Sequence, residues 1–587
     1  MPERVDGLTP TTTPDTGPPA AVRPARARSE TKEHPVRRTL AGTSLLAAAA
    51  LLLTACANPE PVGSSGQTSS STSAAEGATD VADPGDSTIR YALWSNPNGT
   101  FNPLTYFTDY DRAIVFNVYS RLVIVDENQG FTPQLAEGYE WSEDGRTLTF
   151  TLPGDVTWHD GEPFTAEDVA FTYSIQGSAD WPRDTPAFIT EVEGFEEYHS
   201  GAAATVSGIQ VIDPTTVSFT FTQPYSAALS HFADRPVLAK HIWETVPVAD
   251  WDTSPQAGTP VGTGPFKFVT FLPDQYVELE RNEEYLHGAP KAAKLIFTVT
   301  SPETVQTQLV NGELDIAELS SWNPTELTAY EDAGIRVDEQ AGTSLQSLTL
   351  DANDERLQDV RVRQAIVTAI NRTGIVDSLL YGHGAVSNTI GSPLDPAYPD
   401  DLDTYDHDPE AAAALLAEAG WVDTDGDGVV EKDGEPFTFV LNFPTGNKTR
   451  EQSAPIIQQN LQEIGLDVEL VSGDFNSTLA ILQDPAVPYD GVLMGGTFRP
   501  GNYDNNFWWE RFEDPELTAL HDTVVSTVEP EPYAEAVSAW FREVNELAFR
   551  VWLYIPNRGY ASRPEVQGVA TYPYEPFFGV ENWYVGE

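Results

Sequence analysis

Hydrophobic and polar residues follow a regular pattern only from Thr88 onward. The apolar stretch IRYAL after Thr88 predicts a strand, and the turn SEDGRT (142–147) separates two runs of alternating apolar and polar residues, which predicts a hairpin. Thr165 precedes an apolar-periodic stretch and is followed by Asp168, a spacing typical of a helix N-terminus. Residues 113–124 are predicted to form a helix that runs into VIVD.

Helical and strand patterns alternate in the later part of the chain. The predicted order is a helix at 409–418, a strand at 437–443, a helix at 449–464, a strand at 466–471, and a helix from 532 to about 549 that precedes the strand VWLYIP. This alternation of helices and strands is typical of an α/β unit, so it predicts a second lobe with its own core.

A helix is also expected directly after Asp359, which is a suitable N-cap residue. Its apolar positions repeat at helical spacing and share one face, formed by Val362, Ala365, Ile366, Ala369 and Ile370. Arg361 and Arg363 are expected to face outward or to pair with acidic neighbours. The helix therefore has a structural explanation, and we assign none of its residues to a binding site.

The first 87 residues have a different composition. The uncharged run at 39–55 is rich in Ala and Leu and follows Arg37 and Arg38, which is the pattern of a secretory signal. Cys56 comes directly after this run. Because it is the only cysteine of the chain, an intrachain disulfide and a zinc site built on several thiolates are excluded. Residues 57–87 are rich in Ser, Gly, Thr, Ala and Pro, which predicts a flexible tether.

The charge of the chain excludes one class of partner. Its 587 residues hold 89 Asp and Glu against 32 Lys and Arg, a formal net charge of −57. A surface of this sign repels nucleic acid, so no nucleic-acid partner is expected. The length exceeds that of one domain, and 40% hydrophobic residues with 13 tryptophans are sufficient for more than one core.

Several segments carry a resemblance to a known family. They hold W-S-x-D-G, W-H-D-G-x-P-F-x-A-x-D-V, P-V-G-T-G-P-F, N-G-E-L-D-I and D-V-R-V-R-Q-A, and they lie at 141–145, 158–169, 260–266, 311–316 and 359–365. In this order they resemble the signature of family 5 of the extracytoplasmic solute-binding proteins, the peptide/nickel group that serves ABC importers. The resemblance covers roughly residues 88–587. Leu53-Thr54-Ala55-Cys56 resembles a bacterial lipobox, which implies lipidation of Cys56.

The resemblance implies an α/β, two-lobed periplasmic-binding-protein fold of class II, with an extra subdomain and with lobes joined by two crossing strands. The predicted parts are a signal peptide with an extended n-region (1–55), the lipidated cysteine and tether (56–87), lobe I (88–132, 250–345 and a C-terminal return at 556–587), the extra subdomain (133–249) and lobe II (346–555).

The implied function is that of a binding protein rather than an enzyme. We expect a monomer, held on the outer face of the cytoplasmic membrane by lipid on Cys56, that captures oligopeptides or dipeptides and delivers them to a permease–ATPase complex. No G-x-S-x-G, H-E-x-x-H or Walker A motif is present. Two alternatives stay open: an oligosaccharide receptor of the same family, and a secreted hydrolase that uses a pair of carboxylates.

Three loops after predicted strands are candidate walls of the binding cleft. In the family, an aspartate of a G-W-x-x-D-Y-like segment meets the α-ammonium of the peptide. Asp504 lies at the corresponding place here, but no Trp follows Gly496 and the order Tyr503-Asp504 is reversed. The candidate ligand-binding residues are Trp94, Asn96 and Phe101 in the first loop, Ser320 and Trp322 in the second, and Phe498, Tyr503, Asp504 and Trp508 in the third.

One acidic loop is a candidate metal site. Asp423, Asp425 and Asp427, followed by Gly428, match the start of a calcium loop. Position 12 is Gly434, where such a loop needs a glutamate, and Glu431 or Asp433 is the candidate substitute. A structural calcium ion and a plain Asp/Gly hairpin turn are both open at this point, and no other cofactor is expected.

Overall fold

The computed structural model describes residues 87–106, 108–497, 499–501, 503 and 509–586. Its first large sheet has seven strands in the order β12-β21-β11-β1-β10-β9-β8. β1 pairs in parallel with β10 and β11, and the other pairs are antiparallel. The strands are β1 (Thr88–Leu93), β8 (Phe266–Leu272), β9 (Tyr276–Arg281), β10 (Lys294–Val299), β11 (Ile316–Glu318), β12 (Arg336–Gln340) and β21 (Arg558–Ser562).

The second large sheet has six strands in the order β14-β20-β13-β19-β17-β18. β17 pairs in parallel with β18 and β19, as expected for strands joined by helices, and β13 is antiparallel to β19 and β20. The strands are β13 (Ser344–Leu350), β14 (Gly384–Val386), β17 (Thr438–Pro444), β18 (Asp467–Gly473), β19 (Gly491–Thr497) and β20 (Arg550–Pro556).

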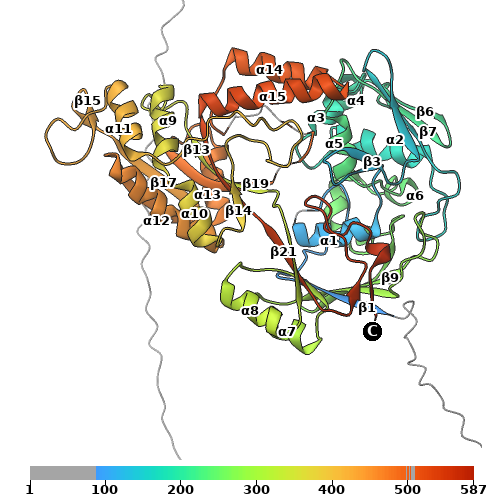
Figure 1. Cartoon of the computed structure of the whole chain (residues 1–587). Helices are drawn as coiled ribbons and strands as arrows, with labels where there is room; N and C mark the ends of the chain where they lie inside the picture. The colour runs from blue at the N-terminus through green and yellow to red at the C-terminus, as the bar shows by residue number, and fades with distance from the viewer. Residues whose placement is uncertain (1–86, 107, 498, 502, 504–508, 587) are drawn as a thin grey trace, which may run out of the picture. The chain divides into compact units, whose positions relative to one another are not determined.

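Two short connections join the sheets, one from β12 to β13 and one from β20 to β21. We therefore call residues 344–556 the second lobe, and residues 87–340 with 558–586 the first lobe. This arrangement confirms the predicted two-lobed α/β fold (Figure 1). The exact boundaries of the predicted parts stay predictions.

A smaller antiparallel sheet lies within the sequence of the first lobe. Its order is β4-β5-β7-β6, and its strands are β4 (Gly138–Trp141), β5 (Thr147–Thr151), β6 (Ile209–Asp213) and β7 (Thr216–Thr220). The turn at 142–147 joins β4 to β5, as predicted. Phe150 and Phe219 pack edge-to-face with each other and with Phe232, so aromatic rings fill much of this core. The remaining short strands are β2 (Val123–Val125), β3 (Phe131–Pro133), β15 (Glu431–Lys432), β16 (Glu435–Pro436), β22 (Val566–Gln567) and β23 (Tyr584–Val585).

Most of the long helices begin at a side chain that caps them. Asp359, Asp408, Asn447 and Asp514 each accept a hydrogen bond from a backbone N–H of the first turn. The helices are α1 (Asp109–Val118), α2 (Ala166–Ser174), α3 (Ala187–Thr190), α4 (Phe195–His199), α5 (Ala228–Asp234), α6 (Lys240–Trp243), α7 (Val305–Asn311), α8 (Pro324–Asp332), α9 (Val360–Ala369), α10 (Arg372–Leu379), α11 (Pro409–Glu418), α12 (Lys448–Glu463), α13 (Phe475–Gln483), α14 (Pro515–Ser526) and α15 (Pro530–Leu547). α14 and α15 lie side by side (Figure 1).

The helix predicted at 113–124 differs from the structure. α1 begins earlier, because Thr108 caps it and accepts a hydrogen bond from Asp111 N, and it ends at Val118. Residues 123–125 form strand β2 instead, paired with β3. β-branched residues and leucine in LVIV are compatible with either state, so periodicity alone did not separate helix from strand.

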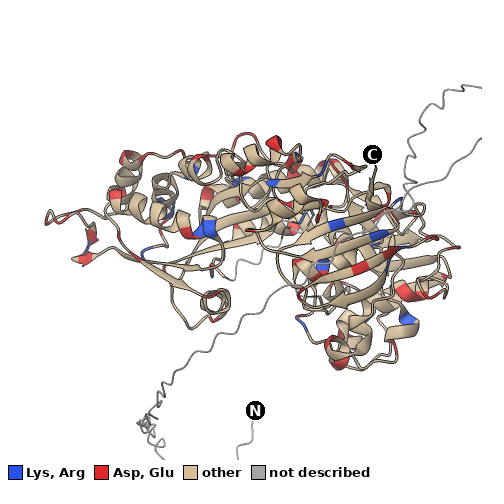
Figure 2. Ribbon diagram, turned by 90° about the horizontal axis from the view of Figure 1, so that it is seen from below, with Lys and Arg blue, Asp and Glu red and all other residues tan. Residues whose placement is uncertain are grey.

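Acidic residues are distributed over the helices and loops of both lobes, and basic ones are fewer (Figure 2). This pattern agrees with a solvated acidic surface. Among the described residues, no helix has the length and hydrophobicity needed to cross a membrane.

Candidate functional site

The two connections between the lobes pack tightly against each other. A Cβ atom on Gly342, in the first connection, would overlap the carbonyl oxygen of Pro556 in the second. Trp322 lies beside them: its indole N–H donates to Asn557 O at 3.0 Å, and its ring stacks on His383 at a centroid distance of 4.2 Å. The region is therefore a narrow, well-packed junction.

A cavity of about 280 Å³ opens in the first lobe near this junction, and we call it the strand-end cavity. It is formed where β1 and β11 end and β21 begins. Arg558 and Glu318 both line it and lie 3.3 Å apart, and the Glu318 carboxylate raises the pKa of the Arg558 guanidinium. The other charged and aromatic residues that line it are Tyr91, Trp94, Asp109, Tyr110, Arg112, Phe116, Tyr560 and Phe577.

A larger cavity of about 450 Å³ is lined by both lobes, and we call it the inter-lobe cavity. The first lobe contributes aromatic and polar residues from around β3, β4 and α5, and the second lobe contributes the 395–397 loop, the chain after β19 and the start of α15. Its principal lining residues are Phe131, Tyr139, Trp141, Ser226 and Leu229 from the first lobe and Asp395, Ala397, Tyr503, Val528 and Tyr533 from the second.

The two lobes are in direct contact beside this cavity. Arg499 of the second lobe lies 2.5 Å from the carboxylate of Asp234 in α5. Ser226 donates its hydroxyl and its backbone N–H to the carbonyl oxygens of Val524 and Val525. Burial opposes the charge of Asp234, but Arg235, Arg499 and Arg112 hold the pKa of its carboxyl below the ordinary value. The lobes therefore meet through charged and polar groups.

Asp395 is the one charged residue among the described residues of the inter-lobe cavity. Its carboxylate is partly buried and accepts a hydrogen bond from Ala397 N at 2.8 Å. Burial raises the pKa of this carboxyl to about 6 from an ordinary value of 3.8. Because the folded protein holds the proton more tightly than the unfolded chain, this group's contribution to stability is lost as the pH rises from about 4 to about 6.

Asp395→Asn is therefore expected to stabilise the empty protein at pH 7.5, by at most about 3 kcal/mol, because it removes a partly buried charge and keeps an acceptor for Ala397 N. At pH 4 the gain should largely disappear. Urea unfolding of both proteins at the two pH values measures this difference. A variant that is less stable than the wild type at pH 7.5 would show that the carboxylate has a structural partner instead.

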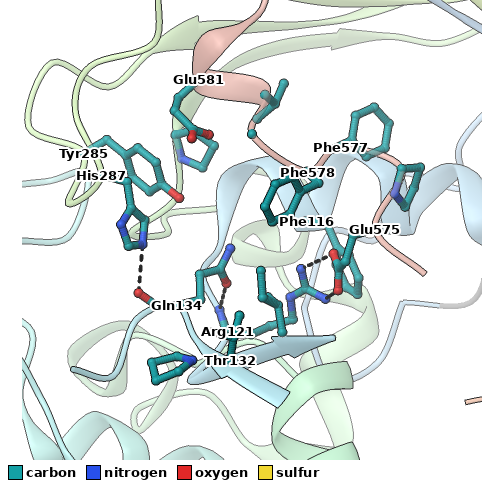
Figure 3. Close-up of a pocket in the computed structure, with 16 residues that line it drawn as sticks. Phe116, Arg121, Thr132, Gln134, Tyr285, His287, Glu575, Phe577, Phe578 and Glu581 are labelled. Atoms are coloured by element: carbon teal, nitrogen blue, oxygen red, sulfur yellow. Dashed lines mark hydrogen bonds and ion pairs between the residues drawn. The ribbon is translucent and has the colours of Figure 1, made fainter. Parts of the chain in front are cut away.

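A third cavity, also of about 280 Å³, lies wholly within the first lobe (Figure 3). At its base Arg121 and Glu575 form a bidentate ion pair with distances of 2.7 and 2.6 Å, and Arg121 also donates to Ala233 O. On its other side, the imidazole Nε2 of His287 is hydrogen-bonded to the backbone carbonyl oxygen of Gln134. The described residues that line it all belong to the first lobe, and its ion pair is buried and neutralised there, so we assign it a structural role.

The predicted ligand-binding residues have different surroundings. Trp94 lines the strand-end cavity and Tyr503 lines the inter-lobe cavity. Asn96 accepts a hydrogen bond from Asp274 N, and Ser320 is exposed. Phe101 is fully buried against Phe268 and Phe271, and Trp322 belongs to the junction. Four predicted residues lie outside the described part of the chain: Cys56, Phe498, Asp504 and Trp508.

Other residues of the two cavities were not predicted. Glu318 ends the strand that precedes a predicted loop, and Arg558 follows the strand VWLYIP, so the rule that ligands meet strand ends would have found both. Asp395 and Tyr533 carry no such signal, because they are 138 positions apart and each has an ordinary loop or helix context in the sequence.

The acidic loop gathers three carboxylates. Oxygens of Asp423, Asp425 and Glu431 lie within 4.8 Å of one another, and Asp427 is not part of this group. Asp423 already accepts hydrogen bonds from Gly426 N and Gly428 N, as in a hairpin turn. All three groups are at or near the surface, so a bound calcium ion stays a prediction.

Two α/β lobes, joined by two crossing connections and lined on facing sides by aromatic and charged residues, define the class of two-lobed solute-binding proteins. Residues 130–514 match the model of the bacterial extracellular solute-binding proteins, family 5. The chain belongs to this family, which is a family of transport proteins rather than of enzymes, and its members act outside the cytoplasm.

Named relatives support the same assignment. The chain is similar to the oligopeptide-binding protein AppA of Bacillus subtilis, with 28% identity over 93% of this chain and 98% of the relative. The structure of that protein in complex with a nonapeptide has a TM-score of 0.71 at 25% identity and covers 86% of this chain and 100% of its own. Two relatives from Escherichia coli are the dipeptide-binding protein (29% identity, 72% of this chain, 78% of the relative) and the nickel-binding periplasmic protein (28%, 67% and 72%).

Proposed function

We propose that the protein is the extracytoplasmic binding component of an ABC importer, and that it captures oligopeptides between its lobes and delivers them to the membrane permease. The observation that carries the proposal is the inter-lobe cavity, which both lobes line and which lies beside their direct contacts. A ligand bound there touches both lobes, so binding favours the closed arrangement that an importer can recognise.

The chemistry of the cavities fits a peptide. Aromatic rings give apolar walls for side chains of different sizes, and the paired Arg558 and Glu318 offer a donor and an acceptor for polar groups of an extended chain. Among the described lining residues of both cavities there is no histidine. Imidazole is a preferred nickel ligand, so this lining favours a peptide over a nickel ion as cargo.

The lipid anchor is part of the proposal. Cys56 follows a secretory signal pattern, and lipidation there would hold the binding protein close to its permease through the tether at 57–87. We propose that the mature chain begins at Cys56, is a monomer and remains on the outer face of the cytoplasmic membrane.

Mass spectrometry of the full protein, extracted from its membrane in mild detergent, tests this function. Under native conditions we expect additional masses that correspond to a mixed set of peptides, and denaturation should release them. The denatured chain should begin at Cys56 and carry the mass of acyl groups. A series of hexose masses would replace the peptide proposal by the oligosaccharide receptor, and a chain that retains residues 1–55 would contradict the anchor.

A further inference from the structure

The inter-lobe cavity combines a single negative charge with aromatic walls. Among the described residues that line it, Asp395 is the one acid, and no lysine, arginine or histidine is present. The residues left out of the description within 498–508 include no basic side chain either. The carboxylate therefore faces the cavity without a counter-ion from its lining.

The described groups that interact with the Asp395 side chain come from three parts of the chain, and none of them is positively charged. Ala397 N donates to its Oδ1 from the same loop. The other two groups are Tyr533, from α15, and Tyr574, from the C-terminal segment. Burial raises the pKa of each phenol, and the negative charge of the Asp395 carboxylate raises it further. A carboxylate in this setting is incompletely compensated, which is unfavourable unless a ligand supplies the charge.

The walls around this carboxylate are flat rings. Tyr139 and Trp141 of β4 and Tyr503 and Tyr533 of the second lobe line the same cavity. The faces of such rings attract ammonium and guanidinium groups, and arginine stacks on them readily. The volume of about 450 Å³ lies within the usual range of small-ligand pockets.

We propose that the inter-lobe cavity is the subsite for a basic side chain, arginine or lysine, of the bound peptide, with Asp395 as its counter-ion. This inference rests on the proposed function and narrows it to a ligand class. The net charge of the chain acts in the same direction, because a strongly acidic protein attracts cationic peptides and repels acidic ones.

Matched peptides test the proposal without altering the protein. Alanine peptides of three, five and seven residues are made with one arginine at each position in turn, and a second set carries citrulline, which has nearly the same shape and no charge. Their affinities for the full protein, freed of ligand by unfolding and refolding, are measured by calorimetry. We expect at least one position at which the arginine peptide binds about tenfold or more tightly than the citrulline peptide.

Asp395→Asn then assigns the preference to one residue. The variant should bind the arginine and citrulline peptides equally at that position, because an asparagine carries no charge to pair with the guanidinium. Asp400→Asn, a change at an exposed acid of the same loop, is the matched control and should keep the full preference.

Three results would overturn the proposal. Equal binding of arginine and citrulline peptides at every position contradicts a basic subsite and leaves the peptide function standing. Acetylation of the peptide N-terminus removes the α-ammonium charge. If acetylation removes the part of the affinity that depends on Asp395, and replacement of arginine by citrulline does not, the carboxylate binds the α-ammonium and not a side chain. If the wild type binds none of the peptides, the proposed function fails and the subsite fails with it.

Discussion

Glu575→Ala is expected to destabilise the first lobe by about 3–5 kcal/mol, because it removes one partner from a buried ion pair. Glu575 and Arg121 are 6% and 5% exposed, and their two parallel contacts neutralise both charges away from water. Without Glu575, the guanidinium keeps its hydrogen bond to Ala233 O but has lost its counter-charge. Urea unfolding followed by tryptophan fluorescence measures the change in the free energy of unfolding.

An exposed ion pair of the same chemistry provides the control for this prediction. Arg146 and Glu193 are 2.5 Å apart, but 38% and 45% of their side chains are exposed. Glu193→Ala is therefore expected to change the free energy of unfolding by less than about 1 kcal/mol. If both alanine variants unfold at the same urea concentration, the pair at Glu575 contributes no more than a surface contact.

Gly342→Ala is expected to destabilise the protein by about 1–3 kcal/mol or more, because the added methyl group overlaps the carbonyl oxygen of Pro556. The overlap involves backbone, which cannot rotate away as a side chain does. The two connections must then separate, and the lobes should close less completely on a ligand. Urea unfolding reports the loss of stability, and small-angle scattering with and without peptide reports the change in closure.

Gly138→Ala is the matched comparison for this glycine. Its added Cβ would have no neighbour within 4 Å, so stability and closure should both stay near the wild-type values. Wild-type behaviour of Gly342→Ala would mean that the two connections are not held together as described, and that the lobes move about another point.

Local sequence patterns were reliable where one helix face or one strand decides the outcome. The stripe predicted after Asp359 is buried in α9, and Asp359 caps that helix as expected. The prediction for Arg361 is confirmed by its ion pair with Asp359 at 2.6 Å, but that for Arg363 is wrong. Arg363 is buried and donates to the carbonyl oxygens of Leu357, Gln358 and Leu547. The third carbonyl comes from a helix 184 residues away, which periodicity cannot reveal.

The candidate site was harder to predict from the sequence, because it too depends on contacts between residues that are far apart in the chain. Trp94 and Tyr503 were predicted because they follow strands, and both line cavities, while their contact with a ligand stays a prediction. Phe101, in the same loop as Trp94, is instead part of the hydrophobic core of the first lobe. Nothing in a loop sequence distinguishes an aromatic residue that lines a cavity from one that packs below it, because the difference depends on β8, more than 160 positions later.

The place of β21 in the first sheet also determines when that lobe can fold. β21 lies between β12 and β11, although it is formed by residues 558–562, near the end of the chain. During synthesis, β11 and β12 are made more than 200 residues before β21, the strand that pairs with both. The first lobe therefore cannot complete its sheet until synthesis is almost finished, which delays stable folding. A chain destined for export would remain competent for threading through a translocation pore during that interval.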